Sequence, residues 1–176
     1  RRVDYTCQLV GILAAILPEG VAGSISTVPC SYGEWIESVA DVRQMAVTLA
    51  LVAGECHEIL CETGQCITIA LEPEPDCYVE TTDEVIDFIT GPLVTVGAET
   101  LCAQLGCSAE EAAAMLRTHI GMCFDTSHQA VEFESFSNSL AALGNAGVTV
   151  AKIHLSSALE FTATPDALAA AAKFVE

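Results

Sequence analysis

Apolar residues gather in four short runs along the chain, and the segments between these runs have the periodicity of helices. The runs cover residues 22–28, 66–71, 120–124 and 148–155. Their length predicts four strands that alternate with helices, which is typical of a parallel sheet with its helices outside. An open doubly wound sheet and a closed barrel both fit this pattern, so periodicity alone leaves the choice open.

Apolar stripes and capping residues predict the helices. We expect them at residues 4–17, 34–60, 85–90, 98–105, 108–117, 134–143 and 166–175. Capping boxes at Thr81 and Glu84 and at Ser108 and Glu111 open two of them. The pair at positions 91–92, Gly-Pro, is expected to end the helix at residues 85–90.

The length of the chain limits the possible architecture. A complete (β/α)₈ barrel needs about 250 residues, with about 200 as a lower limit, and this chain has 176. It begins Arg1-Arg2-Val3 and ends within an Ala-rich segment with helical character. We therefore expect residues 1–176 to be a single domain that forms an internal fragment of a longer protein.

Composition and charge narrow the class of protein. Apolar residues make up 52% of the chain, which is typical of a globular protein. The longest apolar run, residues 9–17, is too short to cross a bilayer and lacks the basic flank of a signal peptide. Because of the short length of this run, we expect no transmembrane segment. A net charge of −18 repels phosphate backbones, so we also expect no nucleic-acid partner.

The nine cysteines are an odd number and include no C-x-x-C pair. We interpret them as reduced core residues of a cytoplasmic protein. A structural zinc cluster of Cys56, His57, Cys61 and Cys66 is disfavoured, because the spacing matches no standard zinc site. On a helix, Cys56 and Cys61 would also lie about 140° apart.

Potential metal ligands follow three consecutive predicted strands. Glu72 follows the second strand, Asp125 and His128 follow the third, and His154 lies near the end of the fourth. Because function sits at the carboxyl ends of parallel strands, these side chains are expected to meet there. Carboxylate oxygens with imidazole nitrogens suit zinc, manganese or iron.

Each of these residues also has a structural interpretation. His154 alone is more often a hydrogen-bonded core histidine, and Asp125 is able to cap its own turn. Glu72 and Glu74 fit solvated loop charges equally well. No glycine-rich phosphate loop follows any strand, which disfavours nucleotide binding.

Three segments resemble the xylose-isomerase-like barrels, a group of sugar isomerases and epimerases that also includes endonuclease IV-type repair enzymes. The segments are Leu71-Glu72, Phe124-Asp125-x-x-His128 and Lys152-Ile153-His154-Leu155. The resemblance implies a partial (β/α)₈ barrel that comprises its fourth to seventh strands. It also implies divalent-metal ligands at Glu72, Asp125, His128 and His154.

A closer resemblance covers residues 20–159 and is to the EboE metabolite traffic family. It rests on four segments in order, at residues 23–29, 70–75, 125–134 and 155–159. This family is associated with the movement of prenylated or secondary-metabolite precursors. After His154 the chain reads Leu-Ser-Ser-Ala instead of the Lys and Asp pattern of the isomerases, which argues against sugar isomerisation.

From these observations we predict a metal-dependent, isomerase- or epimerase-like protein that acts on a small-molecule metabolite. Glu74 and Lys152 are the expected proton-transfer groups, and Ser156 and Ser157 are possible hydrogen-bonding groups for the substrate. The alternative is a non-catalytic metabolite carrier. An abasic-site endonuclease fits the ligand pattern but conflicts with the charge. The sequence leaves the oligomeric state open, although an open fragment with two unpaired strand edges is expected to self-associate.

Overall fold

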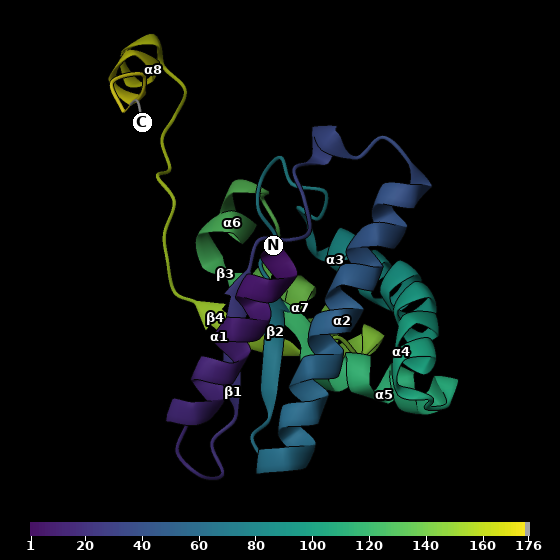
Figure 1. Ribbon diagram of the computed structural model, residues 1–176. Helices are drawn as coiled ribbons and strands as arrows, with labels where there is room; N and C mark the ends of the chain where they lie inside the picture. The colour runs from purple at the N-terminus through teal and green to yellow at the C-terminus, as the bar shows by residue number, and fades with distance from the viewer. Residues whose placement is uncertain (175–176) are drawn as a thin grey trace.

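The computed structural model describes residues 1–174 and has four parallel strands at its centre (Figure 1). The strands are β1 (Gly23–Thr27), β2 (Ile67–Leu71), β3 (Ile120–Asp125) and β4 (Val150–His154), hydrogen-bonded in that order. The sheet curls enough for Lys152 of β4 to line a cavity with Ser24 and Ser26 of β1. The prediction of four parallel strands is therefore confirmed, and together they form a curled half-barrel.

Helices connect the strands, and most of them cover one face of the sheet (Figure 1). They are α1 (Arg2–Ile16), η1 (Gly33–Trp35), α2 (Val39–Thr63), α3 (Thr82–Phe88), η2 (Ile89–Gly97), α4 (Ala98–Leu105), α5 (Ala109–His119), α6 (Thr126–Val131), α7 (Phe136–Ala146) and α8 (Pro165–Ala171). Helix α8 stands away from the rest of the molecule at the end of an extended segment (Figure 1).

The core lies between the sheet and the helices. Ile67, Ile69 and Leu71 alternate along β2 and are fully buried in the main hydrophobic cluster. Helix α2 contributes small buried residues to that cluster, including Ala46 and Ala50, which allow close packing. Because side chains alternate along a strand, the residues between the core positions point to the concave face, where the potential ligands lie.

A β-bulge sets the register between β3 and β4. Met122 pairs with Val150, but Cys123 pairs with Lys152, so Ala151 is the extra residue. Asp125 consequently lies opposite His154. A one-residue shift in register would have moved His154 to the opposite face of the sheet, so this bulge decides whether the histidine reaches the carboxylates.

The predicted capping boxes are present. The Thr81 amide donates to Glu84 Oε2 over 2.9 Å, and the Ser108 amide donates to Glu111 Oε2 over 2.8 Å. A further capping box lies at Ser38, whose amide donates to Asp41 Oδ2 over 2.9 Å. This cap explains why α2 begins at Val39, so the prediction of a helix from residue 34 was wrong at its start.

The predicted helix break at Gly91-Pro92 was also wrong. Residues 82–105 form one continuous helix, and its middle part, η2, is a π-helix with Pro92 inside. Proline has no amide hydrogen and its ring crowds the preceding turn of an α-helix. The wider π-helical turn accommodates both effects and allows the helix to continue.

Several other element boundaries differ from expectation, most of them by one to three residues. Residues 126–131 form α6, which the sequence pattern did not predict. Helix α7 continues past Gly144 to Ala146 and is capped by Gly147, which has the left-handed conformation typical of a helix end. The last helix begins as expected after the Thr164 cap but ends at Ala171, and residue 175 lies outside the described residues.

Two helices pass a simple test for membrane spans. Residues Val39–Thr63 and Thr82–Leu105 have a mean hydropathy of 1.2 and 1.4 in their most apolar windows. Both helices also supply core residues to the sheet, and a core helix of a soluble protein passes the same test. Their length and composition therefore do not establish a membrane span.

Candidate metal centre

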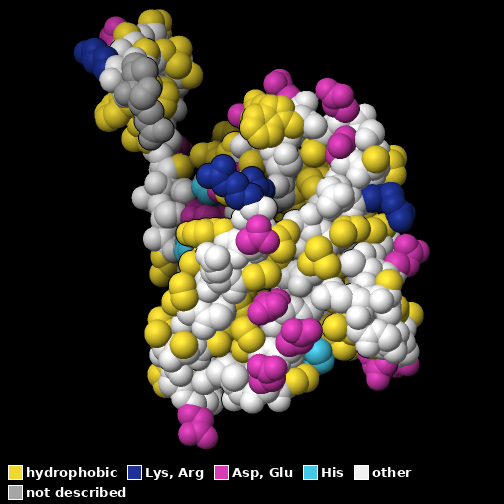
Figure 2. Space-filling view, in the orientation of Figure 1, with side chains coloured by type: hydrophobic (Ala, Val, Ile, Leu, Met, Phe, Trp, Pro, Cys, Tyr) yellow, Lys and Arg dark blue, Asp and Glu magenta, His cyan; other side chains and the backbone are white. Residues whose placement is uncertain are grey.

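Glu72, Asp125, His128 and His154, here called the ligand cluster, meet at the carboxyl ends of β2, β3 and β4. Glu72 continues β2, because its amide donates to Thr27 O over 3.0 Å before Pro73 ends the ladder. Asp125 is the last residue of β3, and His154 is the last residue of β4. Figure 2 shows histidine and acidic atoms together near the base of the protruding C-terminal segment.

The shortest contacts within the cluster centre on His154. Its Nδ1 lies 3.0 Å from Glu72 Oε1 and 3.5 Å from Asp125 Oδ2. Glu72 Oε1 also lies 4.0 Å from His128 Nδ1. Single donor atoms of Glu72, Asp125 and His128 all lie within 4.8 Å of one another, a spacing that suits a shared cation.

Asp125 uses its two oxygens differently. Oδ1 accepts hydrogen bonds from the Ser127 amide over 2.8 Å, the His128 amide over 3.3 Å and the Ser156 hydroxyl. These bonds cap α6 and fix the carboxylate. Oδ2 remains directed at His154. The structural interpretation of Asp125 as a capping residue and the interpretation as a ligand are therefore compatible.

The hydrogen bonds of Asp125 also set its protonation state. Burial by itself would raise the pKa of this carboxyl, but the hydrogen bonds from Ser156 and Ser127 and from the amides of Ser127 and His128 lower its pKa to about 2. Asp125 is therefore ionised at neutral pH, as a hard cation requires of its ligand.

His128 is oriented by the end of β2. Its Nδ1 lies 2.8 Å from Pro73 O, a hydrogen bond in which the ring nitrogen donates to the carbonyl. This bond fixes the tautomer and leaves Nε2 as the available lone pair, a common arrangement for metal-binding histidines.

Cys123 is a residue near the cluster that the sequence interpretation assigned only to the core. It lies two residues before Asp125 on the same face of β3, and its Sγ falls close to donor atoms of Glu72 and His154. Burial, with a contribution from Glu72, raises the pKa of this thiol to about 12. Cys123 is therefore a neutral thiol here. The period of two along β3 was the signal in the sequence that pointed to it.

Two groups of three residues could hold a metal ion: Glu72 with Asp125 and His128, and Glu72 with Cys123 and His154. The two expected proton-transfer groups, Lys152 and Glu74, belong to neither of them. Lys152 pairs with Cys123 in the sheet, one inward position deeper than His154, and lines the cavity next to α1. Glu74 is half-buried and lies 4.0 Å from Cys77 Sγ. Both Ser156 and Ser157 are exposed, but only Ser156 is hydrogen-bonded to Asp125 within the described residues.

Each of the two groups of possible ligands offers donor atoms close enough together to hold a cation. Among residues 1–174, only histidines lie within ion-pair distance of the Glu72 and Asp125 carboxylates. Two negative charges that share one His154 nitrogen are poorly neutralised, and a divalent cation would balance them. Two carboxylates and two imidazoles are ligands that zinc, manganese and iron accept.

The remaining two histidines lie elsewhere. His119 is fully buried and its Nδ1 lies 2.8 Å from Ile67 O, whereas His57 lies on α2 with its Nε2 3.5 Å from Cys61 Sγ. All nine cysteines are free, in agreement with reduced thiols. No protein-family model and no curated protein matches the chain.

Proposed function

We propose that this chain is a segment of a xylose-isomerase-like (β/α)₈ barrel that binds one divalent cation through the ligand cluster. The proximity of Glu72, Asp125 and His154 at the ends of three neighbouring strands carries the proposal, because the fold brings the strand ends together and each of them supplies a potential metal ligand. Zinc, manganese and iron all suit the donor set. The similarity to the EboE family supports a role in processing or trafficking a small metabolite in the cytoplasm.

The bound metal would act as a Lewis acid on a carbonyl or hydroxyl oxygen of the metabolite. The residues of the chain supply negative charge, hold the ligand side chains in place and offer a polar contact to the substrate. Asp125 and Glu72 provide negative charge, and the bonds to Ser156 and Pro73 hold Asp125 and His128 in place. The exposed Ser157 hydroxyl lines a hollow with Thr126 and Ser156 beside the cluster, where it is placed to contact a polar substrate.

Metal content tests this proposal directly. The protein is loaded with zinc, manganese or iron, desalted, and analysed by elemental mass spectrometry. We expect about one equivalent in the natural sequence, and its loss in His154→Ala and Asp125→Asn. Asp125→Asn is chosen because an asparagine still caps a helix, so metal loss reports on the charge.

Two variants outside the cluster serve as matched controls. Glu74→Gln removes a nearby carboxylate, and His57→Ala removes a histidine on α2; both should retain metal. Equal retention in all variants, or no retention in the natural sequence after reconstitution, contradicts the proposal.

A non-catalytic carrier is the second candidate, and one observation favours it. Within the described residues, neither Lys152 nor Glu74 forms a hydrogen bond or an ion pair with the ligand cluster, so neither is held there as a proton-transfer group. Turnover of hydroxy-carbonyl compounds by the metal-loaded protein would support the enzyme. Saturable metabolite binding without turnover would support the carrier.

A further inference from the structure

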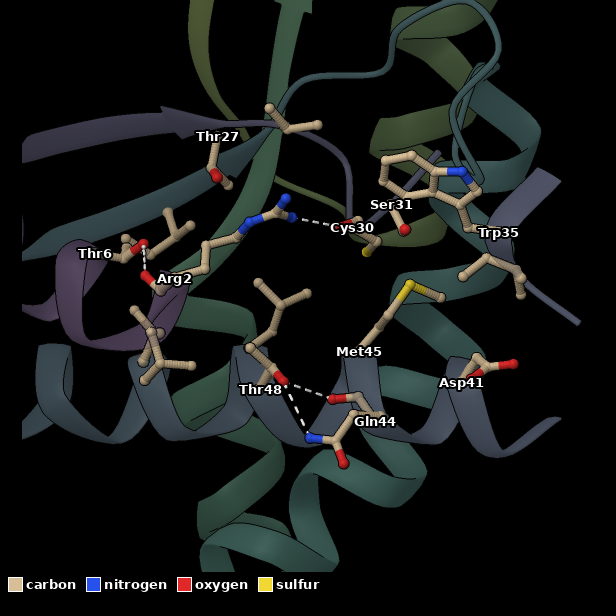
Figure 3. Close-up of a pocket in the computed structure, with 16 residues that line it drawn as sticks. Arg2, Thr6, Thr27, Cys30, Ser31, Trp35, Asp41, Gln44, Met45 and Thr48 are labelled. Atoms are coloured by element: carbon tan, nitrogen blue, oxygen red, sulfur yellow. Dashed lines mark hydrogen bonds between the residues drawn. The ribbon is translucent and has the colours of Figure 1, made fainter. Parts of the chain in front are cut away.

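A cavity of about 400 Å³ lies between α1, α2 and the chain that follows β1 (Figure 3). Its volume falls within the range of small-molecule sites, about 300–1,000 Å³. Thr27 and Ile69 line it, and Ile69 belongs to the helix-facing side of the sheet. Because Glu72 lies an odd number of residues further along the same strand, it points to the other face. The cavity is therefore separate from the ligand cluster.

The wall of this cavity is largely apolar. Met45, Leu49 and Val52 project from α2, and Ile69 completes the inner surface. Trp35 borders the cavity and is 72% exposed, so its ring is accessible to a bound molecule. These side chains would cover the apolar part of a bound molecule.

The cavity also contains a cation that has no acidic partner in the described part of the chain. Arg2 points into it, and its Nη1 donates to Cys30 O over 2.6 Å (Figure 3). The ion pairs of residues 1–174 use the amino terminus, Arg43 and histidines, and none involves the Arg2 guanidinium. Within the described residues, the Cys30 carbonyl is the hydrogen-bond partner of the Arg2 guanidinium, which leaves its other N–H groups for a ligand.

One carboxylate does border the cavity, but it is already bound. Asp41 Oδ2 accepts hydrogen bonds from the amide and the hydroxyl of Ser38, which cap α2. Figure 3 shows Asp41 at the far side of the cavity from Arg2. The remaining polar groups near Arg2 are neutral, among them Thr6, Thr27 and Ser31. A ligand would thus meet the positive charge of Arg2 at one end of the cavity and the capping carboxylate of Asp41 at the far side.

We propose that this cavity binds a small amphipathic anion. Its carboxylate or phosphate head pairs with Arg2, in a geometry that a guanidinium suits well. Its apolar body lies along α2, against Met45 and Leu49, with Trp35 as a cover. This assignment is independent of the metal centre and of the reaction proposed there.

Trp35 makes the test direct, because it is the single tryptophan of the chain. Decanoate is titrated into the whole protein, below its micelle concentration, while Trp35 fluorescence is followed. We expect a saturable change with decanoate or with decyl phosphate, and the tighter of the two identifies the preferred head group. Decanol and decylammonium, which lack the anionic head, should bind about tenfold or more weakly.

Three variants assign the binding to this cavity. Arg2→Ala should weaken decanoate binding about ten- to a hundredfold while decanol is unaffected, because a charge-assisted pair is lost. Thr48→Phe, which adds a ring at the cavity wall from α2, should abolish binding of both. Arg43→Ala removes a surface arginine paired with Glu99 and should bind as the natural sequence does. Circular dichroism establishes that each variant is folded.

Several results would overturn the proposal. They are the absence of any saturable change with either anion, equal affinities for decanoate and decanol, and unchanged decanoate affinity in folded Arg2→Ala or Thr48→Phe.

Discussion

Asp125 couples the local fold to the ligand cluster through its two carboxylate oxygens. Oδ1 caps α6 and binds Ser156, whereas Oδ2 faces His154. A capping residue is worth about 1 kcal/mol, so the chain stabilises α6 and positions a potential ligand with one side chain. A substitution there should alter stability and metal binding to different extents.

The low pKa of Asp125 leads to a prediction about pH. Its folded-state pKa of about 2 lies below the ordinary value, so the ionised carboxylate stabilises the fold. This contribution is complete above about pH 4, the ordinary range of the unfolded chain, and is lost as the pH falls towards 2. Urea unfolding should show that the natural sequence exceeds Asp125→Asn in stability at pH 5 and loses this advantage by pH 2. A constant difference would contradict the interpretation.

The buried His119 should make the stability of the fold depend on pH in a different, higher range. Burial lowers the pKa of this histidine, with the Ile67 carbonyl opposing and His57 adding to the effect. The unfolded state therefore takes up a proton before the folded state does, and stability should fall as the pH drops below about 6.5. His119→Asn keeps a donor for Ile67 O without this titration, so its stability should vary less between pH 7 and 5. Chemical denaturation at both pH values measures the difference, and an equal slope in the two proteins would count against it.

At the scale of elements, β3 and the segment around the bulge of β4 approach each other closely at Gly121. A Cβ at Gly121 would lie 2.6 Å from Thr149 O and 3.2 Å from the Ala151 Cβ. Gly121→Ala should therefore destabilise the protein by about 1–3 kcal/mol, as overpacking does. It should also weaken metal binding, because the same bulge directs His154 to the concave face.

Gly144 provides the control for this prediction. It lies within α7, and a Cβ there would meet nothing within 4 Å. Gly144→Ala should stabilise the protein by about 0.5–1 kcal/mol through helix propensity. Thermal unfolding of both variants tests the pair, and destabilisation of similar size in both would refute the argument from the bulge.

For the whole molecule, the outer edge at β4 is the least covered part of the sheet. Ile153 is 54% exposed and Leu155 is 89% exposed, and Phe136 and Leu140 of α7 are also partly exposed. β4 pairs on one side only within the described residues. An apolar, unpaired strand edge favours association with other chains.

We therefore expect this chain to self-associate in solution through the β4 edge. Ile153→Lys should shift the protein towards the monomer, because a lysine at a strand edge opposes pairing. Ile16→Lys, on α1, replaces another exposed isoleucine and should have little effect. Light scattering after size-exclusion chromatography measures the change, and a monodisperse monomer in the natural sequence would disprove the expectation.

The sequence by itself determined the order of the elements, because their signals are local. Runs of apolar residues predicted β1 to β4 to within two residues, and the Thr81 and Ser108 capping boxes mark real helix starts. The strand ends also located Glu72, Asp125 and His154 correctly, since parallel strands bring their carboxyl ends together.

Only the tertiary structure decided which side chains meet. The bulge between Met122 and Cys123 places His154 beside Glu72, and no local pattern specifies a bulge that depends on the neighbouring strand. Pro92 remains inside a helix because packing stabilises a π-helical turn that propensity alone disfavours. Local signals depend on neighbours in sequence, whereas register and burial depend on residues far apart in the chain. The ligand cluster and the Arg2 cavity are both built from residues that are far apart in the chain.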